Sequence, residues 1–169
     1  MAEWRIEALA DHHERGAFSC GKTPLDVFLR TQASQYARKG TGRTYVAVAP
    51  DSARVVGYYT VSASSVAFEH VPRAVAKKLP KHPVPTILLG RLAIDTAAQG
   101  QGLDTLLLMD ATSRALGIAE QLGVFAVHAH AIDDDAHGWY ARFGFQSLLD
   151  QERHMMLPIE TIRKGFSKA

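Results

Sequence analysis

The feature that most constrains the fold is an apolar stretch, Thr86–Ile94, that passes through a glycine-rich turn into a helical pattern. Leucine and isoleucine side chains in this stretch favour a buried strand. The turn, Gln99-Gly100-Gln101-Gly102, has little side-chain bulk at its glycines, and helical spacing then extends to about Leu116. A buried strand that leads through a turn into a helix is a building unit of α/β domains.

The rest of the chain alternates in the same way. Period-two and β-branched patterns predict further strands, and capping residues with apolar side chains at helical spacing predict helices. The expected strands are Trp4–Leu9, Thr44–Ala49, Val55–Val66, Val124–Ala131, Phe145–Leu149 and His154–Leu157, and the expected helices are Thr23–Ala33, Val71–Leu79 and Asp134–Phe143. We therefore predict an α/β fold, a central mixed sheet flanked by helices, in a single domain over residues 1–169.

Composition excludes several classes of protein. Hydrophobic residues make up 47% of the chain, too many for a disordered protein. No apolar run approaches the ~20 residues that cross a bilayer, and the acidic start of the chain is unlike a signal peptide. Cys20 is the single cysteine, so the chain cannot form an internal disulfide. These features predict a cytoplasmic protein that does not contact a membrane.

Residues 16–23, Gly-Ala-Phe-Ser-Cys-Gly-Lys-Thr, match a phosphate-binding loop motif. That motif requires a buried strand leading directly into the loop, and the preceding residues 11–15 are polar. Pro24 also removes a main-chain N–H at the start of the following helix. We therefore interpret this segment as a turn followed by a helix start.

Histidines offer the only pattern that could indicate a metal site. His12 and His13 are adjacent, so they cannot share one face of a helix or strand. His128 and His130 do share a strand face, but no third ligand stands near them at a recognisable spacing. We therefore predict no metal site and expect these side chains to pack or to line a cleft.

Two other segments contain residues typical of functional sites, a glycine-rich turn and a tyrosine on a predicted helix. Glycines at residues 99–102, just before a helix, let main-chain N–H groups approach an anion such as a pyrophosphate, although glycine-rich turns are common. In residues 137–145 an amphipathic helix would bury Trp139 and Phe143 and leave Tyr140 best able to face a cleft. A buried tyrosine with a satisfied hydroxyl is the equal alternative for Tyr140.

The net charge is +2, which does not by itself identify a nucleic-acid-binding protein. Basic side chains nevertheless gather in two places, and each cluster is compatible with a phosphate backbone or with a solvated surface. The clusters are Arg38, Lys39 and Arg43, and Arg73, Lys77, Lys78, Lys81 and His82.

Two of these motifs together resemble the GNAT family of acetyltransferases. The residues Gln99-Gly100-Gln101-Gly102-Leu103 resemble that family's pyrophosphate loop, Q/R-x-x-G-x-G/A. The run Trp139-Tyr140-Ala141-Arg142-Phe143-Gly144-Phe145 resembles its FY..FGF signature, at a spacing that also fits.

Further blocks resemble the GNAT toxins of bacterial toxin–antitoxin pairs and cover nearly the whole chain. They are Phe18–Gly21, Leu25-Asp26, Phe28–Arg30, Arg43–Val46, Val56–Tyr59, Pro85–Asp95 and Val127–Ala129. The resemblance implies transfer of acetyl from acetyl-CoA to the α-amine of aminoacyl-tRNA, which stops translation. It also implies a homodimer, a ribbon-helix-helix antitoxin as partner, and contact with operator DNA only through that antitoxin.

The resemblance assigns the catalytic role to Tyr140. We expect acetyl-CoA to be held by Leu92, Ala93, Ile94, Gln99, Gly100, Gln101, Gly102, Leu103, Asp104 and Phe143, with main-chain N–H groups of the 92–94 strand on the acetyl carbonyl. Candidate tRNA contacts are Arg91, Lys77, Lys78, Arg38 and Lys39.

Asp104 departs from the family pattern, which has Gly or Ala at the last loop position. Its carboxylate either weakens the binding of a pyrophosphate or caps the helix and points away. Two alternative functions stay open, the first because the net charge is mild and the second because of Asp104. One is acetylation of a small amine or a protein N-terminus, and the other is an inactive module that only binds an antitoxin.

Overall fold

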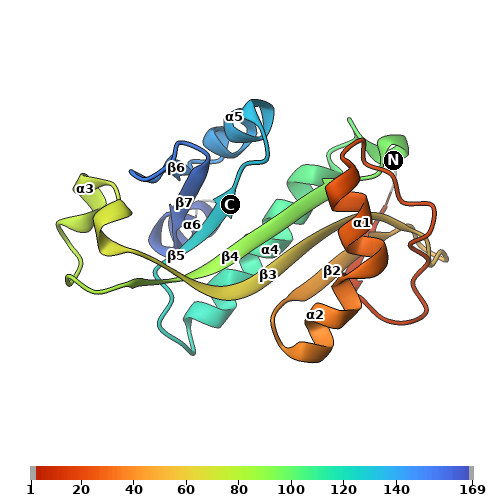
Figure 1. Cartoon of the computed structure of the whole chain (residues 1–169), viewed down its shortest axis with the longest axis horizontal. Coiled ribbons are helices and arrows are strands. Elements are labelled where there is room, and N and C mark those ends of the chain that lie inside the picture. Colours follow the sequence, from red (N-terminus) through yellow and green to blue (C-terminus); the bar gives the residue numbers. More distant parts are fainter. Residues whose placement is uncertain (1–2, 168–169) are drawn as a thin grey trace. The chain divides into compact units, whose positions relative to one another are not determined.

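A computed structural model describes residues 3–167 of the chain (Figure 1). Its strands are β1 (Arg5–Ala8), β2 (Arg43–Val48), β3 (Val55–Val66), β4 (Val84–Ile94), β5 (Ala126–His130), β6 (Gln146–Ser147) and β7 (His154–Pro158). Its α-helices are α1 (Thr23–Thr31), α2 (Ala33–Lys39), α3 (Arg73–Ala76), α4 (Leu103–Ala119), α5 (Asp134–Arg142) and α6 (Ile159–Ser167), with 3-10 turns η1 (Phe68–His70) and η2 (Thr96–Ala98).

The strands of residues 3–167 form one seven-stranded sheet in the order β1-β2-β3-β4-β5-β7-β6. The β4–β5 pair is parallel, whereas β1–β2, β2–β3, β5–β7 and β6–β7 are antiparallel. The prediction of an α/β fold with a mixed sheet flanked by helices is therefore confirmed.

Internal contacts divide the chain into two compact units. The first contains the chain up to Ser62 together with Gly90–Ala111, and the second contains Ala63–Leu89 and the chain from Thr112 onward. Strands β3 and β4 and helix α4 each pass from one unit into the other. The single domain over residues 1–169 stays a prediction.

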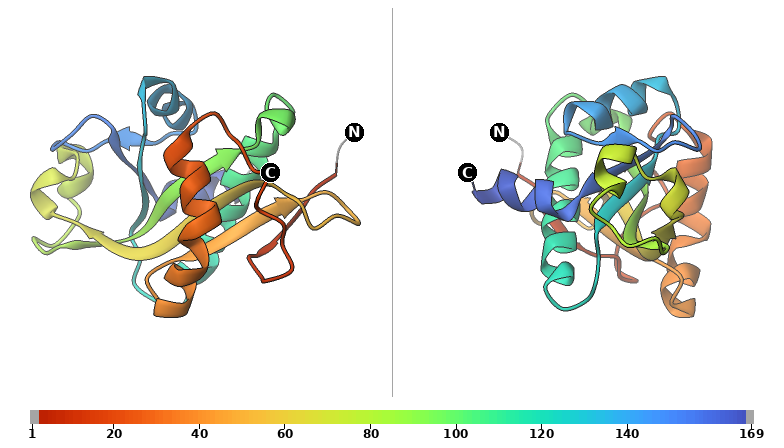
Figure 2. Two further views of the ribbon diagram at one scale, coloured as in Figure 1. Left: turned by 45° about the vertical axis from the view of Figure 1, so that its right-hand side comes forward. Right: turned by 90° about the vertical axis from the view of Figure 1, so that its left-hand side faces the viewer.

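In the first unit, α1 and α2 lie on one face of the strands and the start of α4 lies on the other (Figure 2). Burying an aromatic or leucine side chain stabilises the fold by roughly 1.5–3 kcal/mol. The cluster under α1 and α2 contains four such side chains, Phe18, Phe28, Leu29 and Tyr58. The smaller side chains of Ala33, Val46, Val48, Val55 and Ala93 fill the space around them.

Gly57 on β3 sets how closely α4 approaches the sheet. A Cβ at this position would lie 3.0 Å from Leu107, 3.1 Å from Leu103 and 3.2 Å from Ile94. Only glycine leaves room for these side chains, because contacts this short force a neighbour to move. Leu103 and Leu107 are buried there, which fixes the first turns of α4 against the sheet.

The second unit is organised around the parallel β4–β5 pair. Thr86–Leu89 pair with Ala126–Ala129, and β7 continues the sheet on the other side of β5, with His130 opposite His154. Helix α6 packs against β5 and β7. The buried residues of a hydrophobic cluster in this unit are Val66, Val71, Val84, Ala126, Leu148 and Met156.

The sequence missed or misplaced several elements. Helix α2 was not predicted, because a break at Gln32 separates it from α1 and its sequence contains little apolar patterning. Helix α6 was not predicted because it follows β7 directly, with no turn residues between. The predicted helix over residues 71–79 is the shorter α3. No helix among residues 3–167 is long and apolar enough to span a membrane.

Candidate functional site: the glycine loop and the end of β5

The loop before α4 is open where an anion would approach. Gly100 and Gly102 have φ of 78° and 87°, a backbone conformation that favours glycine. Apart from the residues next to them in the chain, no described residue of 3–167 has an atom within 4 Å of where their Cβ atoms would be. Beyond them, the first N–H groups of α4 lack partners within the helix, and the helix dipole adds positive potential. This arrangement fits the pyrophosphate of acetyl-CoA.

Asp95 anchors the loop, and the sequence did not identify it as a functional residue. Its buried carboxylate accepts hydrogen bonds from the N–H of Ala97 at 2.9 Å and of Ser19 at 3.1 Å. The N–H of Thr96 donates in turn to the Ser19 carbonyl at 2.9 Å. An Asp directly after a buried strand and before a helical turn is a capping signal that would have indicated this role.

The two glutamines of the loop use their side chains within the protein. Gln99 Nε2 donates to the Ile94 carbonyl at 2.9 Å and to the Cys20 carbonyl at 3.1 Å. Gln101 Nε2 donates to the Ala97 carbonyl at 3.2 Å. Gln99 therefore braces the loop against the end of β4, and only its main chain and its amide oxygen are left to face a ligand.

Asp104 lies in the first turn of α4, where the sequence placed it. Its Oδ1 accepts a hydrogen bond from the N–H of Thr105 at 2.8 Å. The carboxylate therefore caps one first-turn N–H group and brings a negative charge to the end of the helix that favours anions. Both alternatives for Asp104, helix cap and competitor of a pyrophosphate, keep physical support.

The end of β4 carries the other predicted residues of the first unit. Ala93 and Ile94 are buried and Leu92 is half-buried. The Arg91 guanidinium lies 3.7 Å from the centre of the Phe28 ring and 5.7 Å from that of Tyr36. This cation–π stacking fixes the plane of the guanidinium.

Tyr140 and Phe143 belong to α5 in the second unit. The prediction that Trp139 and Phe143 are the buried pair is wrong: Tyr140 is 6% exposed, while the other two are half-buried. Gly144, with φ of 94°, turns the chain so that the Phe145 ring packs 5.1 Å from Tyr140. Trp139 packs at the same distance from Tyr140.

The Tyr140 hydroxyl has the properties of a proton donor. Burial raises the pKa of this phenol well above its ordinary value, so the hydroxyl stays protonated at neutral pH. No hydrogen bond from Tyr140 Oη is found among residues 3–167, where every fully buried side-chain polar atom has a partner. The oxygen is therefore accessible to a ligand.

Of the predicted tRNA contacts, Arg38, Lys39, Lys77 and Lys78 are exposed, whereas Arg91 is half-buried. Arg38 and Lys39 lie in the last turn of α2, where positive charge also stabilises the helix dipole. Lys77 follows α3 as its cap residue, and Lys78 is next in the chain. Each pair lies within a single unit of the chain.

The phosphate-loop string at residues 16–23 has its main chain occupied by the protein itself. The N–H of Cys20 donates to the buried carboxylate of Asp26 at 2.9 Å. Lys22 is the N-cap of α1, and Gly21 has φ of 92°. These contacts agree with the interpretation as a turn and a helix start.

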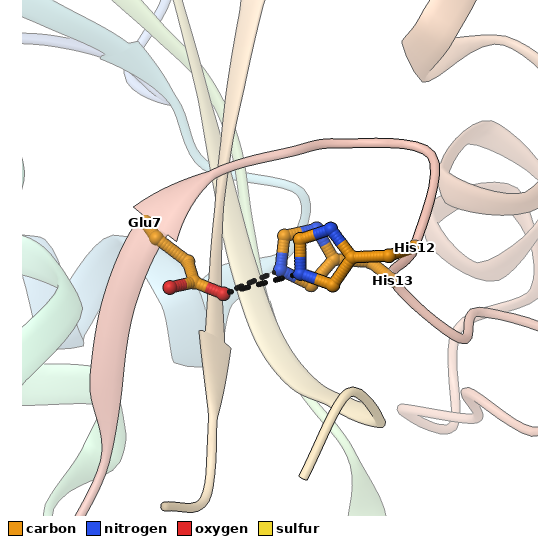
Figure 3. Close-up of side chains that lie close together, drawn as sticks. All are labelled: Glu7, His12 and His13. Atoms are coloured by element: carbon orange, nitrogen blue, oxygen red, sulfur yellow. Dashed lines mark hydrogen bonds and ion pairs between the residues drawn. The ribbon is translucent and has the colours of Figure 1, made fainter. Parts of the chain in front are cut away.

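Glu7, His12 and His13 converge in a turn after β1 (Figure 3). Among the described residues they are the one group of three possible metal-binding side chains whose ligand atoms all lie within 4.8 Å of one another. Glu7 Oε1 is 2.7 Å from His13 Nε2 and 3.8 Å from His12 Nε2. Adjacent histidines meet here because they lie in a turn rather than in a helix or strand.

Hydrogen bonding argues against metal ligation by this group. His13 Nδ1 accepts from the N–H of Ala10 at 2.9 Å, so the ring proton is on Nε2 and is donated to Glu7. A metal ion on Nε2 would move that proton to Nδ1, where it would face the Ala10 N–H. The hydrogen bond from His13 also holds the pKa of Glu7 below its ordinary value. We interpret the group as a set of hydrogen bonds that stabilises the turn after β1.

A second histidine group lies at the carboxyl end of β5. The sequence showed no third metal ligand at a recognisable spacing from His128 and His130, and strand pairing with β7 places the ring of His154 beside them. The rings of His130 and His154 stack with centroids 3.9 Å apart. His154 Nδ1 lies 2.9 Å from the carboxylate of Asp150.

The structure thus groups the predicted site residues by unit. The first unit holds Leu92, Ala93, Ile94, Gln99, Gly100, Gln101, Gly102, Leu103 and Asp104, and the second holds Tyr140 and Phe143. Asp95 and the group around His130 are additions that sequence reasoning missed.

Comparison with known proteins gives a consistent family. Residues 6–145 match the acetyltransferase (GNAT) family. A tRNA-acetylating toxin of Mycobacterium tuberculosis (strain ATCC 25618 / H37Rv) is 36% identical over 155 residues, 92% of each chain. The probable toxin TacT of Sinorhizobium fredii (strain NBRC 101917 / NGR234) is 29% identical over 90% of this chain and 89% of its own.

Solved structures agree with these relatives. A Tyr-to-Phe mutant of KacT superposes with a TM-score of 0.91 at 30% identity, covering 96% of this chain and 99% of its own. AtaT complexed with acetyl-methionyl-tRNAfMet gives a TM-score of 0.90 at 30% identity, covering 97% and 99%. By sequence and by fold, this chain belongs to the GNAT family of acetyltransferases.

Proposed function

We propose that this chain is a toxin that transfers the acetyl group of acetyl-CoA to the α-amine of an aminoacyl-tRNA. The observation that carries the proposal is its 36% identity, along 92% of the chain, with a tRNA-acetylating toxin. The likeness to AtaT bound to acetyl-methionyl-tRNAfMet supports the same class of acceptor.

Acetyl-CoA supplies an activated acetyl thioester. The N–H groups of Gly100, Gln101, Gly102 and Leu103 hold its pyrophosphate, with the helix dipole of α4 contributing. Asp104 opposes this binding through its charge, and Phe143 contributes an apolar contact. Main-chain N–H groups of Leu92–Ile94 donate to the acetyl carbonyl as negative charge develops on its oxygen.

Tyr140 acts as the general acid. The leaving thiolate needs a proton, and a buried phenol with an accessible hydroxyl can donate it. The raised pKa of Tyr140 keeps its proton in place until charge develops on the sulfur. An acceptor amine attached to an ester needs little activation, because a free α-amine already has a pKa of about 8, and esterification lowers it.

Lysine and arginine side chains bind the tRNA backbone. Arg91 is the strongest candidate, because its stacking on Phe28 holds the guanidinium plane for a phosphate. Lys77, Lys78, Arg38 and Lys39 add electrostatic attraction. Reversing the charge at Lys77 and Lys78 together should weaken tRNA binding and flatten its dependence on salt. An unchanged slope would remove this patch from the binding surface.

The likeness to toxin–antitoxin assemblies suggests the partners. Structures of AtaT with the C-terminus of the antitoxin AtaR and acetyl-CoA, and of an AtaT–AtaR complex bound to DNA, resemble this chain. We expect a ribbon-helix-helix antitoxin, contact with operator DNA only through it, a homodimer, and a cytoplasmic location.

The test is acetyl transfer from labelled acetyl-CoA to three acceptors: charged tRNA, spermidine and a peptide with a free N-terminus. We expect label on charged tRNA, released as an N-acetyl amino acid by base. Label only on spermidine or the peptide would identify an acetyltransferase of small amines or protein N-termini and would overturn the tRNA proposal.

Asp104 favours one second candidate, an inactive module that only binds an antitoxin. Its carboxylate already caps the Thr105 N–H at the end of α4 that would receive the pyrophosphate. No labelled product and no heat of acetyl-CoA binding, together with tight binding of a ribbon-helix-helix antitoxin, would support this candidate. Growth arrest on expression of the chain alone would count against it.

A further inference from the structure

A chain of polar contacts runs through the second unit from the buried strand β4 to the surface. Thr86 Oγ1 is 3.2 Å from His128 Nδ1, and His128 Nε2 is 3.2 Å from His130 Nε2. The His130 ring stacks on His154, whose Nδ1 is 2.9 Å from Asp150 Oδ2. His70 Nδ1 lies 3.9 Å from the same carboxylate oxygen.

These residues converge from different parts of the unit: β4, β5, β7, the turn before β7, and η1. The contacts connect a buried histidine to an exposed one. His128 is 5% exposed, the His154 side chain 24%, and His130 is exposed. A buried polar side chain is costly, so hydrogen-bonded histidines inside a sheet need a reason beyond packing.

Both histidines of β5 have a pKa below the ordinary value, which keeps them neutral at physiological pH. Desolvation, together with the neighbouring His130 and His154, lowers the pKa of His128 to about 4. Desolvation and His154 also lower the pKa of His130, while the carboxylate of Asp150 opposes the shift. His130 is thus an uncharged imidazole that can accept a proton.

The hydrogen bonds allow one tautomer that presents a lone pair to solvent. If His130 Nε2–H donates to His128 Nε2, then His128 Nδ1–H donates to the Thr86 hydroxyl, and His130 Nδ1 is left as an acceptor. On the other side, a proton on His154 Nδ1 is donated to Asp150. A charge on His128 would be buried, so a proton taken by His130 stays at the exposed ring.

His130 lies at the edge of the sheet where a ligand is expected to bind. The parallel β4–β5 register ends at Leu89 and Ala129, and His130 is the last residue of β5. Ligands of open α/β sheets bind beyond the carboxyl ends of parallel strands. Helix α5, which carries Tyr140, begins only four residues after His130, at Asp134.

We propose that His130 accepts the proton that the acceptor ammonium must lose, with His128 and Thr86 as positioning residues that set its tautomer. This inference rests on the proposed acetyl transfer and adds a base for the fraction of the acceptor that is still an ammonium below neutral pH. His128, His154 and Asp150 lie around His130 and set how readily it takes and releases that proton.

The step balances. The ammonium gives one proton to His130 Nδ1, and the neutral amine forms the N–C bond while the C–S bond breaks. The thiolate takes a proton from Tyr140, and the new amide nitrogen loses its second proton, which restores Tyr140 through solvent. His130 then releases its proton past His154 and Asp150 to water, so each acetyl transfer yields one free proton.

The test compares His130→Ala with His12→Ala, an exposed histidine on a turn of the other unit. The readout is kcat/KM for transfer to charged tRNA across pH 6 to 8.5, with calorimetric acetyl-CoA binding and melting temperature as folding controls. His130→Ala should lose about tenfold at pH 6.5, where most of the acceptor amine is still an ammonium. It should lose far less at pH 8.5, where the amine is largely neutral, and added imidazole should restore activity at low pH.

A pH profile parallel to the wild type, or no rescue by imidazole, would overturn the inference while acetyl transfer by the wild type stands. If the wild type transfers nothing, the proposed function fails, and a separate readout still decides the tautomer. Nitrogen-15 shifts of the apo protein at pH 7 should show His130 protonated on Nε2 and His128 neutral. A His130 protonated on Nδ1 would overturn the inference. In His128→Gln, the His130 ring should lose its preference for the tautomer protonated on Nε2.

Discussion

The glycine loop before α4 and the carboxyl end of β5 contribute to the proposed chemistry through different groups, main-chain N–H groups in the loop and side chains on β5. The loop offers main-chain N–H groups around Gly100 and Gly102, in open space. The end of β5 offers side chains, His128 and His130, held by hydrogen bonds and stacking. A main-chain site depends on residues adjacent in the chain, whereas a side-chain site depends on strands that only tertiary pairing brings together.

The largest expected effect removes one oxygen from α5, the helix that follows β5 in the chain. Tyr140→Phe should lower acetyl transfer by about 100- to 1,000-fold, because the leaving thiolate loses its proton donor. Acetyl-CoA affinity, measured by calorimetry, should stay within about twofold, because the glycine loop is untouched. Equal activity would remove Tyr140 from the chemistry, and a joint loss of binding and melting temperature would make its role structural.

The next effect is on stability and belongs to His128. Its folded pKa of about 4 lies below the ordinary 6.5, so between these values the unfolded chain binds a proton that the native chain does not. The free energy of unfolding should therefore fall by up to about 3 kcal/mol as pH drops from 6.5 to 4. Urea unfolding of His128→Gln should lack this fall. Parallel curves for the two proteins would contradict the assignment.

A smaller effect tests the loop through Asp104. Asp104→Asn keeps an oxygen that can accept from the Thr105 N–H but removes the charge. We expect acetyl-CoA to bind about tenfold more tightly at low ionic strength, with the gain shrinking as salt screens the carboxylate. Asp51→Asn, in the β2–β3 turn, makes the same change in net charge and should leave affinity unchanged. Equal gains in both variants would indicate a general charge effect.

The smallest effects distinguish a glycine with positive φ in the loop, Gly102, from a glycine inside the following helix, Gly117. Gly102→Ala places a side chain at φ of 87° and should cost about 1–2 kcal/mol in the free energy of unfolding, with weaker acetyl-CoA binding. Gly117→Ala lies within α4, where a Cβ meets nothing, and should gain up to about 1 kcal/mol. Urea titration measures both, and shifts of the same sign would contradict this account of the loop.

Sequence reasoning reached the elements with strong local signals. The buried strand before the loop, the long helix after it and the strand of β5 all lie near their predicted positions. Short elements with weak patterning, α2 and α6, were missed, because packing rather than local preference stabilises them. The sequence left the burial of Tyr140 open as one of two equal alternatives, since the Phe145 ring reaches it only after the turn at Gly144.

The sequence by itself determined the glycine loop, the α/β class and the family. These follow from contiguous patterns: glycine freedom, hydrophobic periodicity and short motifs are properties of neighbouring residues. Only the tertiary structure decided that Asp95 anchors the loop to Ser19 and that His154 and Asp150 join His130. The physical reason is that such contacts join residues far apart in the chain, and strand pairing and packing alone bring them within hydrogen-bonding distance.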